Sequence, residues 1–106
     1  MDTNPRILAL LEFIKDDPDD ASAKYMLSLE YIKADKFQDA LQWMSAIHME
    51  HPQYLPNYYH YGKLLERLSI LEKATEIYTE GMAVAREQND QHTFMELKGA
   101  FEMLTM

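Results

Sequence analysis

The sequence contains no cysteine among its 106 residues. That absence excludes disulfide bonds, thiolate nucleophiles and cysteine-ligated metal sites, and it fits a reducing compartment. We therefore expect a cytoplasmic location. Long apolar runs are also missing, because the longest, Ile7–Leu11, is far shorter than the ~20 residues that a membrane-spanning helix needs.

Glycine is equally scarce, and the 3 glycines leave no phosphate-binding loop and no dinucleotide-binding fingerprint. Positive charge is in deficit, since 10 Lys and Arg face 18 Asp and Glu, for a net charge of −8. An acidic chain is poorly suited to bind phosphate backbones or anionic lipid. We therefore expect neither nucleic acid nor a membrane among its partners.

The residues that are abundant favour helices. Leu, Met, Ala, Glu, Lys and Gln are all good helix formers, and no Asn-Gly or Asp-Gly hairpin dipeptide occurs. Hydrophobic residues make up 47% of the chain, which is too many for a disordered segment. The sequence thus predicts an all-α protein, and residues 1–106 are short enough to form a single domain.

Capping signals divide the chain into about six helices. Asn4 followed by Pro5 predicts the first start, and Asp17-Pro18 predicts its end. A second helix is expected from Asp19 or Asp20 to about Lys33. The later starts are expected at two capping-box pairs, one proline and one polar break: Asp35 with Gln38, Ser69 with Glu72, Pro56, and Asn89-Asp90.

An internal offset of 34 residues relates two parts of the chain. It pairs prolines, small residues and large apolar residues with their counterparts: Pro18 with Pro52, Ala40 with Ala74, Tyr25 with Tyr59, Tyr31 with Leu65, and Met44 with Tyr78. Helical hairpins repeated every 34 residues are typical of one repeat architecture.

With these residues the sequence resembles the tetratricopeptide repeat (TPR) family. Two repeats carry signature positions: Leu27, Ser28, Tyr31, Ala40, Met44, Ile47 and Pro52, then Tyr58, Tyr61, Gly62, Leu65, Ala74 and Tyr78. The resemblance implies a right-handed stack of antiparallel helix pairs, a TPR-like α-solenoid. Its predicted parts are an N-terminal half-repeat helix, two repeats, and a C-terminal capping helix or half-repeat: 1–19, 20–54, 55–88 and 89–106.

The sequence departs from the family pattern at several positions. Lys24 stands where the family has a bulky aromatic residue, and Arg86 replaces the closing proline of the second repeat. Asp35 and Ser69 replace the glycine between helices, and we expect each to cap the helix that follows. The last helix is offset by 36 residues instead, which indicates a two-residue insertion around Glu87–Asp90.

The resemblance implies a concave groove that binds a peptide segment or helix of a partner protein. Carried over position by position, its expected lining is Ser22, Tyr25, Leu29 and Ile32 from the first repeat, Tyr59, Lys63 and Arg67 from the second, and His92, Met95 and Met103 from the last helix. Inter-repeat packing is the competing interpretation of the two tyrosines. The family's two-carboxylate clamp is absent, since Tyr25 and Leu29 occupy its lysine and asparagine positions.

No arranged catalytic residues stand out, and we expect a non-enzymatic scaffold without a cofactor. His48 and His51 have a spacing compatible with metal ligands, but further ligands are not evident, so a solvated helix end is the preferred interpretation. The alternative function is self-association, as a homodimer through the apolar helix at residues 91–106.

Overall fold

The computed structural model describes residues 4–106, and within that range every regular element is an α-helix. The chain divides into two compact units, the first ending at His51 and the second running from Pro52 to Met106. The all-α class predicted from the sequence is confirmed. The predicted N-terminal half-repeat, 1–19, includes three residues that lie outside the described range.

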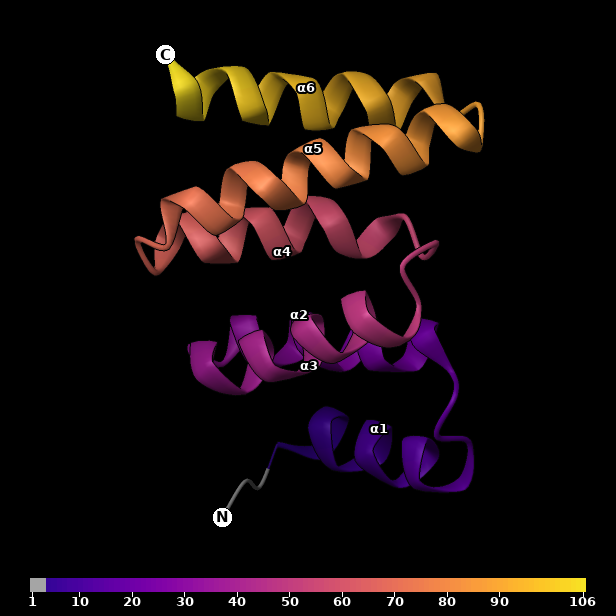
Figure 1. Cartoon of the computed structure of the whole chain (residues 1–106). Coiled ribbons are helices and arrows are strands. Elements are labelled where there is room, and N and C mark those ends of the chain that lie inside the picture. Colours follow the sequence, from indigo (N-terminus) through magenta and orange to yellow (C-terminus); the bar gives the residue numbers. More distant parts are fainter. Residues whose placement is uncertain (1–3) are drawn as a thin grey trace. The chain divides into compact units, whose positions relative to one another are not determined.

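The first unit contains three helices: α1 (Pro5–Asp16), α2 (Ala21–Lys33) and α3 (Phe37–Glu50). Helix α2 packs against both α1 and α3, and consecutive helices run antiparallel (Figure 1). The core of the first unit consists of buried apolar side chains from all three helices: Ile7, Ile14, Leu27, Tyr31, Ala40, Met44 and Ile47.

The second unit contains α4 (Pro56–Arg67), α5 (Leu71–Glu87) and α6 (Gln91–Thr105). Helix α5 packs against α4 and α6, and α4 also contacts α6 directly. Two hydrogen bonds attach the preceding turn to this unit: the Tyr58 hydroxyl donates to the Pro52 carbonyl at 2.7 Å, and the Gln88 side-chain amide donates to the Gln53 carbonyl at 2.7 Å.

Three of the predicted helix starts are capped by side chains as expected. The Asn4 side chain accepts from the backbone N–H groups of Arg6 and Ile7, and Pro5 occupies the first turn of α1. The Asp20 carboxylate accepts from the Ala23 N–H at 2.9 Å, and Asp90 likewise caps α6. Each cap satisfies N–H groups that have no partner within the helix.

The predicted capping boxes at Asp35 and Ser69 are wrong. Helices α3 and α5 begin without a side-chain cap, and Asp35, Ser69 and Asn89 have positive φ angles of 58°, 62° and 58°. Each ends the preceding helix in a Schellman motif, in which the N–H of the next residue donates to the carbonyl five residues before it. The Lys36 N–H, for example, donates to the Tyr31 carbonyl at 2.8 Å. These residues therefore terminate helices and do not begin them.

Replacing Ser69 with glycine should stabilise the protein by about 0.5–1 kcal/mol. Serine carries a Cβ that is crowded in the left-handed conformation at this position, whereas glycine carries none. Thermal unfolding measured by circular dichroism should show a higher Tm for Ser69→Gly and no gain for Ser69→Ala. A lower Tm for the glycine variant would contradict the left-handed assignment.

Lys24 is buried between α2 and the end of α3. Its side chain is 7% exposed, and its Nζ lies 3.4 Å from the Glu50 Oε1. The long aliphatic stem fills the space, while the ammonium group reaches a half-exposed carboxylate. The lysine thus occupies the interior position where the family has an aromatic ring.

Two of the three glycines permit close contacts between helices in the second unit. A Cβ at Gly62 would overlap the ring of Tyr78, and a Cβ at Gly81 would lie 2.7 Å from the Tyr58 Cβ. Gly99 is different, because a Cβ there would have no other atom within 4 Å. Gly62 and Gly81 therefore set how closely α5 approaches its neighbours.

Candidate functional site

The expected groove residues of the first unit all lie on α2. Ser22 is exposed, and Tyr25, Leu29 and Ile32 are partly exposed, so no member of the set belongs to the core. Their spacing of three or four residues places them on one side of the helix, while Leu27 points into the interior. The first unit therefore offers an accessible strip that combines one aromatic and two aliphatic side chains.

In the second unit, Tyr59, Lys63 and Arg67 follow one another at four-residue spacing along α4, and they form one stripe, which we call the α4 stripe. Tyr59 is partly exposed, and the two cationic residues are exposed. The Lys63 Nζ lies 5.8 Å from the centroid of the Tyr59 ring, within the range of a cation–π interaction. The tyrosine ring and the lysine ammonium group thus lie close together on α4.

A chain of polar contacts connects this stripe to the core. The Lys63 Nζ lies 3.8 Å from the Glu66 Oε2, and the buried Tyr78 hydroxyl donates a hydrogen bond to the same carboxylate oxygen. Burial and the Glu66 carboxylate both raise the pKa of Tyr78, so the phenol remains a neutral donor. Glu66 is thereby held in place from the core side and orients the lysine.

His60 follows Tyr59 on α4 and is partly buried. Its ring contacts the Tyr59 ring edge to face, at a centroid distance of 5.5 Å and an angle of 82°. Burial lowers the pKa of His60, and the charge of Glu96 on α6 opposes that effect. This arrangement places α6 close enough to α4 for its charges to act on the edge of the stripe.

The expected residues of α6 lie on its outer side. His92, Met95 and Met103 are all exposed, whereas Leu97 and Ala100 on the other side are buried. Met106, which was not predicted from the sequence, is also exposed, at the C-cap of α6. The spacing in the sequence could have indicated this residue, because Met103 and Met106 are three residues apart and such residues are neighbours on a helix surface.

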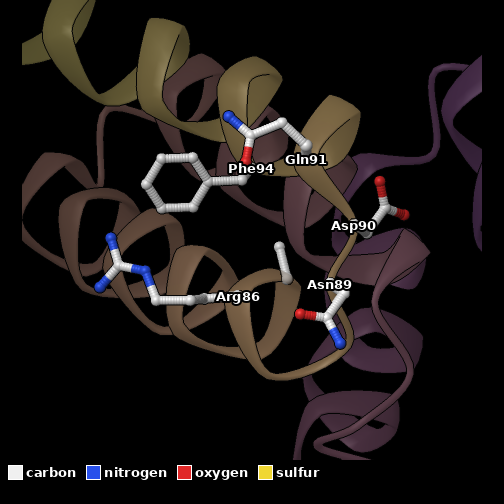
Figure 2. Close-up of a pocket in the computed structure, with 6 residues that line it drawn as sticks. Arg86, Asn89, Asp90, Gln91 and Phe94 are labelled. Carbon is white, nitrogen blue, oxygen red and sulfur yellow. The ribbon is translucent and has the colours of Figure 1, made fainter.

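A cavity of about 290 Å³ lies at the turn between α5 and α6. It is lined by Ala85, Arg86, Asn89, Asp90, Gln91 and Phe94 (Figure 2). The Arg86 guanidinium lies 4.9 Å from the centroid of the Phe94 ring. The Asp90 carboxylate accepts hydrogen bonds from the Thr93 N–H and hydroxyl, which lower the pKa of Asp90.

This cavity was not predicted from the sequence, although Arg86 and the residues of the predicted two-residue insertion contribute to its lining. The cavity combines one cation, two side-chain amides and an aromatic ring, which suit a carboxylate or a peptide amide. The Asp90 charge in the wall opposes a carboxylate ligand, so a neutral peptide amide suits this pocket better.

A second cavity, of about 360 Å³, lies in the first unit between α1 and α2. Its lining consists of Arg6, Ala9, Leu10, Met26 and Glu30, and its walls are mainly apolar. The Arg6 Nη1 lies 3.4 Å from the Glu30 Oε2 across the two helices. The helical pattern of the sequence did not predict this cavity, which we call the α1–α2 groove, because its depth depends on how α1 packs on α2.

Within residues 4–106, no three His, Asp or Glu side chains gather into a set of metal ligands. None of the helices described combines the length and the apolar character needed to cross a bilayer.

Comparison with known proteins gives matches among solved structures. No protein-family model and no curated protein matches the sequence. The crystal structure of a tetratricopeptide repeat domain protein from Salinibacter ruber is 35% identical, with a TM-score of 0.78, over 81% of this chain and 96% of that chain. A solution structure of a tetratricopeptide repeat domain protein from the same organism is 36% identical, with a TM-score of 0.79, over 82% and 88%.

A protein of Bordetella parapertussis, solved in solution, is 22% identical over 99% of this chain and 90% of that chain. Its TM-score is 0.79. At this identity the likeness concerns the fold alone.

Proposed function

Because the chain belongs to the tetratricopeptide repeat family, we propose that it is a non-catalytic module that binds a peptide segment or helix of a partner protein. The resemblance predicted from the 34-residue offset is confirmed. Repeat folds of this kind generally mediate protein–protein interaction through extended concave surfaces. The absence of cysteine supports a cytoplasmic site of action.

The α4 stripe is the observation that carries the proposal. Tyr59 supplies an aromatic surface, and the exposed Lys63 lies near both the Tyr59 ring and the Glu66 carboxylate, which favours one orientation of its side chain. A side chain already held in its binding conformation loses less entropy when a ligand arrives. Aromatic residues of this kind commonly dominate binding energy at protein interfaces.

The partner segment that best fits these residues has apolar side chains and a negative charge. Apolar groups would contact the Tyr59 ring, while a carboxylate would approach Lys63 and Arg67 on the same helix. Because Glu66 already neutralises part of the Lys63 charge, a single carboxylate suits this site better than a run of acidic residues.

The proposal is tested by affinity capture from a native lysate with the double variant Tyr59→Ala/Lys63→Glu. We expect this variant to lose the partners that the wild type retains, because it removes the aromatic surface and reverses the charge. Lys73→Glu is the matched control, since Lys73 is a part-exposed lysine on α5 that also pairs with a glutamate three residues later. Identical captured proteins for the double variant and the wild type would overturn the proposal, provided that both have the same circular dichroism spectrum.

A further inference from the structure

Exposed large hydrophobic side chains are concentrated on the first and last helices and beside the α1–α2 groove. Of the nine such residues in the described range, three lie on or beside α1, namely Leu8, Phe13 and Met26, and three lie on α6 and at its C-cap, namely Met95, Met103 and Met106. Among the described helices, α1 packs mainly against α2, and α6 packs against α5 and α4. Both ends therefore present apolar surface to solvent.

The α1 end is a groove with a positive rim. Ala9, Leu10 and Met26 supply the apolar walls of the 360 Å³ cavity. Arg6 and Lys33 have side chains that are 72% and 66% exposed, and both pair with the same carboxylate, Glu30, which is only 14% exposed. Two cations that share one carboxylate leave a net positive charge at the rim, in a protein that is otherwise acidic.

The α6 end is a ridge with acidic flanks. Met95, Gly99 and Met103 follow one another at four-residue spacing, and Met106 extends the line; we call these four residues the α6 ridge. At 100° per residue, Glu96 and Glu102 lie about 60° to either side of Gly99, so each flank carries a carboxylate. Both glutamates are exposed.

We propose that the α6 ridge of one copy of this chain occupies the α1–α2 groove of a second copy, head to tail. Methionine side chains are flexible enough to fill an irregular apolar cavity. The carboxylates that flank the ridge meet the cations at the rim of the groove. Helix α6 of one copy and α1 of the next also supply the first and second helix of one repeat, so the contact completes a helix pair between molecules.

Charge distinguishes this arrangement from a symmetric dimer of two α6 helices. A two-fold axis, whether the two helices run parallel or antiparallel, would bring an acidic flank of one copy against an acidic flank of the other, since Glu96 and Glu102 lie on the two sides of the ridge. Like charges then meet at the interface, which disfavours association. The head-to-tail contact pairs opposite charges and uses two different surfaces, so it can join more than two copies.

The test uses two variants, one that blocks the groove and one that blocks the ridge. Ala9→Glu places a carboxylate in the groove, and Met103→Glu places one on the ridge; both positions are exposed, so the fold should tolerate them. Light scattering over a range of concentrations should show association for the wild type and monomers for each variant alone. A mixture of the two should form a 1:1 dimer, because the groove-blocked copy keeps its ridge and the ridge-blocked copy keeps its groove.

Two other variants separate this proposal from the partner-binding function. Met49→Glu, at an exposed methionine on α3, and Tyr59→Ala/Lys63→Glu should both associate as the wild type does. A wild type that remains monomeric at high concentration would overturn the inference and leave the α4 stripe untouched. An Ala9→Glu variant that still dimerises alone would also overturn it, in favour of a symmetric contact through residues 91–106.

Discussion

Gly62→Ala should lower the free energy of unfolding of the second unit by about 2–3 kcal/mol, even though alanine is the better helix former. The added methyl group would overlap the ring of Tyr78. That ring has no room to move, because it is fully buried and its hydroxyl is bonded to Glu66. The intrinsic helix preference for alanine, about 1 kcal/mol, is too small to compensate.

Urea unfolding followed by circular dichroism measures this loss, and a second background identifies its cause. In Tyr78→Leu the ring is gone, so the further change Gly62→Ala should cost much less than it does in the wild type. An equal cost in both backgrounds would show that the tyrosine ring is not the obstacle.

Gly81→Ala should destabilise the same unit by about 3 kcal/mol. Here the new Cβ would lie 2.7 Å from the Tyr58 Cβ and 3.0 Å from the Leu97 Cδ1, so it would push α5 away from both α4 and α6. A Cβ moves only with its backbone, and the Tyr58 side chain is also held by its hydrogen bond to Pro52. The steric overlap can therefore be removed only if the helices move apart.

Gly99→Ala is the matched control for this prediction. It makes the same chemical change in the same unit, at a position where a Cβ has no other atom within 4 Å. We expect it to stabilise the unit by about 0.5–1 kcal/mol, because alanine loses less conformational entropy than glycine in a helix. If both variants shifted the urea midpoint in the same direction, the close contact at Gly81 would be contradicted.

The sequence predicted the helices and their faces well, because hydrophobic spacing and proline positions are local signals. Asn4 and Asp20 cap the helices that they were expected to cap. Asp35 and Ser69 do not, since aspartate, serine and asparagine occur both at helix starts and in the left-handed position after a helix. Residue type alone does not distinguish these two roles; the direction of the backbone at that residue does.

The position of the α4 stripe on its helix was predictable from the sequence, but the contacts that connect it to the core were not. The stripe of Tyr59, Lys63 and Arg67 follows from spacing on α4. The role of Glu66 depends on Tyr78, which reaches it from a different helix, and the sequence contains no signal for that contact. The burial of Lys24 was hidden for a similar reason, because its partner Glu50 lies 26 residues away.

The methionines make the outer surface of α6 sensitive to oxidation. In a chain without cysteine, methionine carries all of the sulfur, and Met95, Met103 and Met106 are 51%, 72% and 95% exposed. Peroxide would convert these thioethers to polar sulfoxides before it reached the fully buried Met44. An oxidised copy would keep its core and lose the apolar character of its last helix, and methionine sulfoxide reductases would restore it.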